Sequence, residues 1–120
     1  MVKIVIPVSD ETGEFLSAHF GRAPYFYWLY LEEGKMVDKD VIPNDSEHFG
    51  GFGRPPERIA HLKPDIVVTT GMGIRAINMF QQMEVAVLQA KSRLSSENLD
   101  LFIKGELTEL TEGCLHALHK

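Results

Sequence analysis

Cysteine is nearly absent from this chain of 120 residues, which has only one, Cys114. One thiolate excludes an intrachain disulfide and is too few to hold an iron–sulfur cluster covalently. A chain without disulfides is typical of a reducing compartment, so we expect a cytoplasmic protein. Long apolar runs are also lacking. None approaches the roughly 20 residues of a membrane-spanning helix, and Pro7 interrupts an apolar opening that is too short for a signal peptide. We expect no membrane partner.

Positive charge is scarce as well, because Lys and Arg together number 12 against 17 Asp and Glu, for a formal net charge of −5. A broad basic surface is thereby excluded, and we expect no nucleic-acid partner. The chain also lacks the glycine-rich phosphate-binding loop, the Gly-x-Gly-x-x-Gly fingerprint, the Cys-x-x-Cys pair and the Gly-x-Ser-x-Gly nucleophile elbow. Nucleotide-binding, redox and hydrolase classes lose support, and an anionic ligand would have to be bound locally.

The composition is that of a globular protein, with 44% hydrophobic and 24% charged residues. We expect one domain over residues 1–120, with 110–120 as a candidate flexible tail. Runs of β-branched and aromatic residues predict five strands, at 2–8, 25–31, 35–42, 65–70 and 85–88. Helical patterns separate the later strands, and this order predicts an α/β fold, a three-layer α/β/α sandwich with a five-stranded mixed sheet.

Three helices are expected between and after these strands. The first has prolines at 55–56 in its first turn and ends before Pro64. The second follows a glycine turn at 71–73, and the third is capped by Ser95 or Ser96 and stopped by Gly105. The apolar faces of the second and third helices are expected to carry Ile74, Ile77, Phe80, Leu99, Phe102 and Ile103.

Three loops are candidates for a binding site, at residues 9–23, 44–53 and 69–73. Ligands of open α/β sheets bind outside the carboxyl ends of the strands, so we expect the first and third loops to meet there, with the second alongside. In the first loop, His19 can ligate a metal or donate to an anion, Gly21 relieves backbone restriction and Arg22 is a permanent cation. Phe20, between His19 and Gly21, is a further candidate cofactor-binding residue. The alternative is a histidine that only satisfies nearby carbonyl groups.

The second loop combines His48 with Gly50, Gly51 and Gly53 just before a helix, where free backbone N–H groups favour an anion. A flexible loop with a solvated histidine is the alternative. In the third loop, Gly71 and Gly73 either face a ligand or only let helix and strand pack closely. At the chain end, the spacing of Cys114, His116 and His119 suits three ligands to zinc, copper or iron, or belongs to an ordinary terminus.

Four segments of the chain carry a family resemblance: Lys3 to Pro7, His19 to Pro24, Asp65 to Val68 with the following Gly71-Met72-Gly73, and Gly105 to Leu107. In these segments the chain resembles the nitrogenase iron–molybdenum cofactor-binding family, small domains related to the cofactor carriers of nitrogenase assembly. This resemblance implies a ribonuclease-H-like fold without nuclease activity that binds a preformed metal–sulfur cluster, a bulky polyanion. It implies that His19, Gly21 and Arg22 face the cluster.

Our leading hypothesis is a cytoplasmic, noncatalytic carrier or scaffold of an anionic metal–sulfur cluster containing iron, molybdenum or both, with cluster-assembly or acceptor proteins as candidate partners. A metal- or anion-sensing regulatory module is one alternative. Another is a ribonuclease-H-like metal-dependent hydrolase. The hydrolase needs several converging carboxylates, yet only Asp10 follows a strand end, where a turn-forming role is favoured, and Asp65 lies at the opposite end of its own strand.

Overall fold

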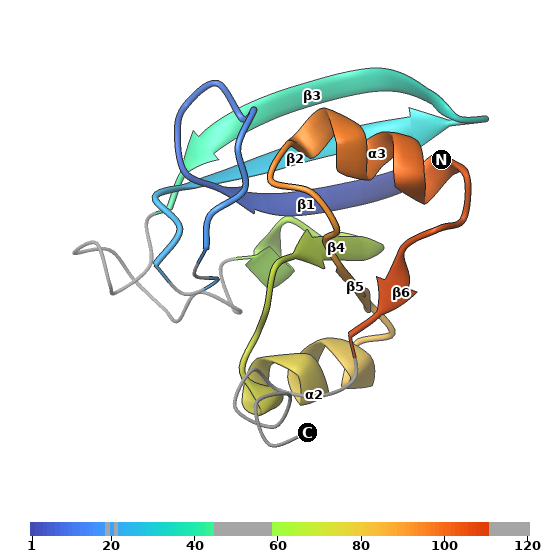
Figure 1. Cartoon of the computed structure of the whole chain (residues 1–120). Helices are drawn as coiled ribbons and strands as arrows, with labels where there is room; N and C mark the ends of the chain where they lie inside the picture. The colour runs from blue at the N-terminus through green and yellow to red at the C-terminus, as the bar shows by residue number, and fades with distance from the viewer. Residues whose placement is uncertain (19, 21, 45–58, 111–120) are drawn as a thin grey trace.

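The computed structural model describes residues 1–18, 20, 22–44 and 59–110 (Figure 1). Residues 59–61 are helical, and this helix ends before Pro64 as predicted. The other elements in chain order are β1 (Val2–Val8), β2 (Tyr25–Glu32), β3 (Lys35–Pro43), β4 (Ile66–Thr69), α2 (Ile74–Gln82), β5 (Ala86–Gln89), α3 (Ser95–Ile103) and β6 (Thr108–Glu109).

The sheet has six strands in the order β3-β2-β1-β4-β5-β6, so the prediction of five was wrong. The mixed character was correct, because β1 pairs in parallel with β4, and β4 with β5, while the remaining pairs are antiparallel. The extra strand, β6, pairs Thr108 with Gln89 and Glu109 with Leu88. Both β6 residues are exposed, so this strand has no apolar alternation to indicate it.

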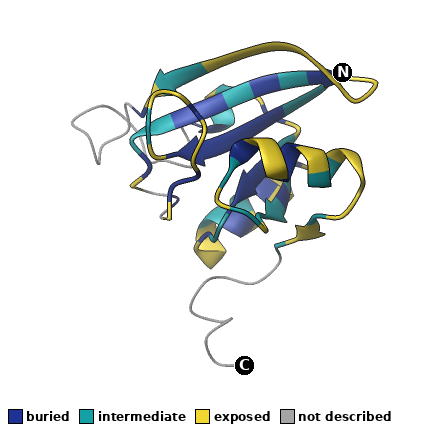
Figure 2. Ribbon diagram, turned by 45° about the horizontal axis from the view of Figure 1, so that its top comes forward, coloured by how far each residue is buried: buried dark blue, intermediate teal, exposed yellow. Residues whose placement is uncertain are grey.

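Helices cover both faces of the sheet, which confirms the three layers (Figure 1). On one face, Ile77 and Phe80 of α2 pack with Ile59 against strand residues that include Val5 and Phe26. On the other face, Leu99 of α3 and Leu16 of the first loop pack against strand residues such as Ile4, Ile6 and Leu29. Residues 4–8 of β1 are buried, as expected for a central strand covered on both faces (Figure 2).

The expected helix faces need two corrections. Ile74 is 50% exposed and Ile103 is 48% exposed, so neither belongs to the core. Ile74 is the first residue of α2, where no preceding turn covers it. The inward stripe of α3 runs through Ser95, Asn98 and Leu99, which leaves Ile103 at its margin.

The start of α3 also differs from the prediction, because its N-cap is Leu94 and makes no side-chain capping bond. The Ser95 hydroxyl donates instead to the carbonyl oxygen of Gly13, at 2.6 Å. This partner is 82 residues away in the chain, beyond the reach of a local capping rule. The predicted stop at Gly105 is correct. Its φ is +73°, and the N–H groups of Gly105 and Glu106 donate to Phe102 and Leu101, closing the helix in a Schellman motif.

Candidate functional site

Four loops leave the sheet at one edge. The carboxyl ends of β1, β4 and β5 lie together because these strands are parallel (Figure 1). The carboxyl end of β3 joins them, since β3 and β1 are both antiparallel to β2. This carboxyl edge therefore collects the three predicted loops and also the loop that follows β5, which the sequence did not single out.

The first loop is folded onto the sheet rather than extended from it. A turn closes from the Gly13 N–H to the Asp10 carbonyl at 3.2 Å, and the Thr12 hydroxyl donates to the Asp10 carboxylate at 2.7 Å. Asp10 is thus a turn former, as favoured from the sequence. Farther along, the Leu16 N–H donates to the Arg93 carbonyl at 2.9 Å, which ties the first loop to the loop after β5.

The first and third loops meet through Thr70, as predicted. The Thr70 hydroxyl lies 3.2 Å from the Ser17 carbonyl oxygen and 3.4 Å from that of Ala18, and it donates to them. The Thr70 carbonyl in turn accepts from the Gln89 side-chain amide at 2.7 Å. A chain of hydrogen bonds therefore crosses the edge from β5 to the segment that leads to residue 19.

Phe20 and Arg22 have opposite environments. Phe20 is only 7% exposed and packs edge-on against Phe80, with ring centroids 6.2 Å apart, so its side chain anchors the loop in the core. Arg22 is exposed, and among the described residues no hydrogen-bond or ion-pair partner holds its guanidinium. An exposed cation thus lies two residues after a buried anchor.

The third loop leads into α2 without a side-chain cap. Gly73 is the N-cap residue, with φ −68° and ψ 153°, and the first turn of α2 contains no acidic residue. A Cβ atom added at Gly73 would have no neighbour within 4 Å. Gly71 is partly buried and precedes it. The first amides of α2, with the positive end of the helix dipole, therefore start beside open space.

Several predicted site residues lie outside the described residues. Asn44, buried at the start of the second loop, fixes the departure of that loop by donating from its N–H to Pro24 and from its side chain to Ala23, at 2.9 and 2.7 Å. Within the described ranges, no three His, Cys, Asp or Glu residues are grouped so that they could hold a metal ion. The predicted residues outside the described part are His19, Gly21, His48, Gly50, Gly51, Gly53, Cys114, His116 and His119.

Two further cations at the carboxyl edge were missed from the sequence. Arg75 lies in the first turn of α2 and Arg93 in the loop after β5, and both are exposed. A signal was present in the sequence, because every arginine of the chain lies between the end of a predicted strand and the first turn of the next element. The arginines are Arg22, Arg54, Arg58, Arg75 and Arg93.

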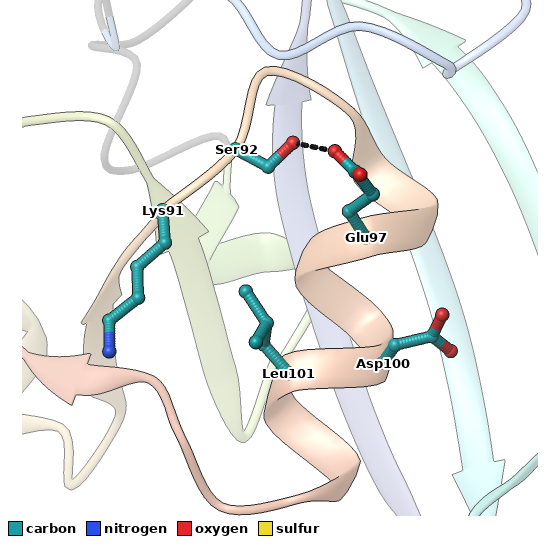
Figure 3. Close-up of a pocket in the computed structure, with 5 residues that line it drawn as sticks. All are labelled: Lys91, Ser92, Glu97, Asp100 and Leu101. Atoms are coloured by element: carbon teal, nitrogen blue, oxygen red, sulfur yellow. Dashed lines mark hydrogen bonds between the residues drawn. The ribbon is translucent and has the colours of Figure 1, made fainter.

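A pocket of about 450 Å³ lies between α3 and the loop after β5 (Figure 3). Glu97 and Asp100 line it together with Lys91, whose ammonium donates to the Glu106 carbonyl at 2.5 Å. The Glu97 carboxylate accepts from the Ser92 hydroxyl (Figure 3). This pocket is unsuited to a polyanion, because two carboxylates line it and its one cation, Lys91, already donates to a carbonyl group.

The carboxylates that a hydrolase would need are not brought together. The Asp65 carboxylate accepts from the Lys3 backbone N–H at 2.9 Å, at the amino end of β4 and away from the carboxyl edge. Asp10 follows the carboxyl end of β1, and its carboxylate accepts from Thr12 in its own turn. Asp10 and Asp65 therefore do not form a pair for binding catalytic metal ions, and no group of three His, Cys, Asp or Glu within the described ranges could hold one.

Comparisons with known proteins find a relative that matches most of the chain and solved structures with the same fold. An uncharacterized protein from Methanocaldococcus jannaschii is 28% identical over 109 residues, 89% of this chain and 90% of that protein. The crystal structure of the protein PH0822 matches with a TM-score of 0.76 at 30% identity, over 89% of this chain and 93% of that one. A candidate dinitrogenase from Methanocaldococcus jannaschii shares the fold, with a TM-score of 0.77 at 18% identity over 92% of this chain and 96% of that one.

In the described part of the chain, none of the helices has the length and apolar character needed to cross a membrane.

The family model for the dinitrogenase iron–molybdenum cofactor matches residues 2–105, which is nearly the whole of the described fold. This chain therefore belongs to the dinitrogenase iron–molybdenum cofactor family.

Proposed function

We propose that this chain binds an anionic metal–sulfur cluster noncovalently at the carboxyl edge and carries it in the cytoplasm without chemical turnover. The observation that supports this most is the junction at Thr70, which joins the first and third loops. In this proposal, the exposed Arg22 of the first loop and the start of α2, which has no side-chain cap, contact the same cargo. Family membership supplies the class of cargo.

The chemistry of such a cargo suits these groups. A metal–sulfur cluster spreads its negative charge over many sulfur atoms, so it is held better by several donors than by one ion pair. Arg22 provides charge and directed N–H groups, and the α2 amides provide donors with a fixed dipole. Gly71 and Gly73 let the backbone approach the cargo, and His19 and Gly21 are our candidates for the ligand and the turn beside Arg22.

The second loop and the chain end take subordinate places in this proposal. His48, Gly50, Gly51 and Gly53 would extend the anion site, since their loop leaves the same edge at Asn44. Cys114, His116 and His119 would bind metal separately. Phe20 serves as an anchor and not as a ligand, because its ring is buried against Phe80. Cluster-assembly or acceptor proteins would deliver or receive the cargo.

The test is anaerobic reconstitution with thiomolybdate, or with iron and sulfide, followed by desalting and visible absorption spectroscopy. We expect a chromophore to elute with the protein and to be reduced by Arg22→Gln and by His19→Ala. The matched control is Lys104→Gln, which makes the same charge change at the far end of α3 and should keep the chromophore. The proposal fails if no chromophore elutes with the unmodified protein, or if Arg22→Gln and Lys104→Gln retain it equally.

A second pair of variants separates binding from folding. Gly73→Ser and Gly73→Asp each supply an N-cap side chain that α2 lacks, so each should stabilise the fold by a few tenths of a kcal/mol. Only the aspartate also adds a negative charge at the proposed site. We expect Gly73→Asp to retain less thiomolybdate than Gly73→Ser while unfolding at the same or a higher urea concentration. Equal retention by the two variants would exclude the start of α2 from the site.

A further inference from the structure

The free edge of β3 has several features that usually invite another strand to pair with it. β3 ends the strand order, so one of its sides has no neighbour in the described sheet. The strand is nine residues long, and six of them are exposed in succession (Figure 2). Met36 and Val37 are 40% and 51% exposed, which adds apolar contact area. Such an edge is normally a site of self-association.

The register of β3 shows which of its amides face this edge. The Asn44 N–H donates to the Pro24 carbonyl at 2.9 Å, one step beyond the pairing of Tyr25 with Pro43. Antiparallel strands alternate their N–H groups between the partner and the opposite side. Even-numbered amides from 38 to 44 therefore point to β2, and the odd-numbered positions 39, 41 and 43 point to the free edge.

Each of these three positions is closed to an incoming strand. The Lys39 N–H donates to the carboxylate of Asp38 at 2.9 Å, and the Val41 N–H donates to that of Asp40 at 2.8 Å. The third position is Pro43, which has no N–H group. At the other end of the strand the register shifts between Tyr30 and Leu31, leaving Val37 as an extra residue that breaks the ladder.

We propose that Asp38 and Asp40 cap the outward amides of β3 and thereby prevent antiparallel pairing of this edge with the β3 edge of a second copy of the chain. An incoming strand needs N–H donors at alternate residues, and the cap leaves none over positions 39 to 43. The carboxylates also oppose pairing by charge, because a symmetric antiparallel arrangement centred on Lys39 would bring Asp38 of one copy opposite Asp40 of the other.

Two double variants separate the cap from the charge. Asp38→Ala with Asp40→Ala removes both, whereas Asp38→Asn with Asp40→Asn removes the charge but keeps a side-chain oxygen that accepts from the next N–H. Size-exclusion chromatography with light scattering over a range of concentrations gives the oligomeric state, and circular dichroism verifies the fold. We expect the original chain and the Asn variant to be monomeric, and the Ala variant to approach twice the monomer mass as its concentration rises.

Other outcomes overturn the proposal. Equal association of the Asn and Ala variants would mean that charge and not the cap keeps the edge free, and a monomeric Ala variant would mean that neither does. The single variants Asp38→Ala and Asp38→Asn test the cap even if a double variant misfolds. Hydrogen exchange of the Lys39 amide should accelerate roughly fivefold in the first, as expected for one lost hydrogen bond, and remain unchanged in the second. Equal exchange in both would refute the cap.

Discussion

Substituting Gly13 by alanine tests how tightly the first loop is pressed onto the sheet. Gly13 is buried with φ +75°, and its carbonyl accepts the Ser95 hydroxyl. A Cβ atom there would lie 2.8 Å from Cγ2 of Val41 and 3.2 Å from two ring carbons of Tyr27. Tyr27 is 7% exposed and cannot swing into solvent. The loop or Val41 must therefore move to admit one methyl group.

The expected loss in the free energy of unfolding for Gly13→Ala is the sum of two parts. A left-handed backbone conformation costs an alanine about 1 kcal/mol relative to glycine. Overpacking by a carbon atom costs about 1–3 kcal/mol more, so Gly13→Ala should lower the free energy of unfolding by about 2–4 kcal/mol. Gly105 is the matched control, because its φ is +73° and nothing lies within 4 Å of its added Cβ. Gly105→Ala should lower the free energy of unfolding only by the backbone cost, about 1 kcal/mol.

Urea unfolding measures this difference, with the emission of Trp28, the one tryptophan, and far-UV circular dichroism as probes. We expect a lower midpoint for Gly13→Ala than for Gly105→Ala, with similar slopes. Gly34→Ala should resemble the control, since its φ is +77° and its nearest contact, to Ile103, is an ordinary 3.6 Å. Equal losses for Gly13→Ala and Gly105→Ala would show that the first loop is not packed against β2 and β3 as described.

Three other predictions concern the loops and the core. Thr70→Val removes the hydroxyl that donates to the Ser17 and Ala18 carbonyls, so it should lower the free energy of unfolding in urea by about 1 kcal/mol and speed amide exchange in the first loop. Thr70→Ser keeps the hydroxyl and should change neither quantity. Asn98→Ala should cost about 3 kcal/mol in the same assay, because the buried amide accepts from two backbone N–H groups and donates to two carbonyls. Burial raises the pKa of Tyr27 above 10.0, so the folded chain keeps the phenol proton to higher pH than the unfolded chain does. The resulting contribution to stability is complete below pH 10 and is lost as the pH rises through the pKa of the folded chain. The urea midpoint should therefore decline at alkaline pH, and Tyr27→Phe should make this decline less steep.

The strands were predictable where their residues are buried by the sheet itself. β1 was placed at its observed bounds, because an unbroken run of β-branched residues on a strand covered on both faces has few other solutions. β6 was missed because its two exposed residues pair only once β5 is in place. The role of Ser95 was missed for a related reason, since its hydroxyl is used by Gly13 and not by its own helix. Predictions from neighbouring residues fail where the hydrogen-bonding partner lies far away in the sequence.

The sequence predicts where the loops of the candidate site meet. It does not predict the direction of each side chain there. The parallel order of β1 and β4 dictates that the first and third loops share an edge, and Thr70 joins them there. The direction of Phe20 depends on where α2 places Phe80, which sequence spacing does not reveal. Arg93 escaped notice because its loop contains no glycine motif, although β5 brings it to the same edge.

Charge distribution links these observations. The net charge of −5 would repel a polyanion over long distances, yet at physiological salt surface charges act over only about 8 Å. Under the proposed function, capture of the cluster would then depend on cations near the carboxyl edge that have no other partner. Lys3 lies over the Trp28 and Tyr30 rings at 5.2 and 5.3 Å, far from that edge, and Lys91 is held by a carbonyl group. Among the described residues, Arg22, Arg75 and Arg93 are exposed cations beside these loops, so retention of an anionic cluster should weaken as salt rises.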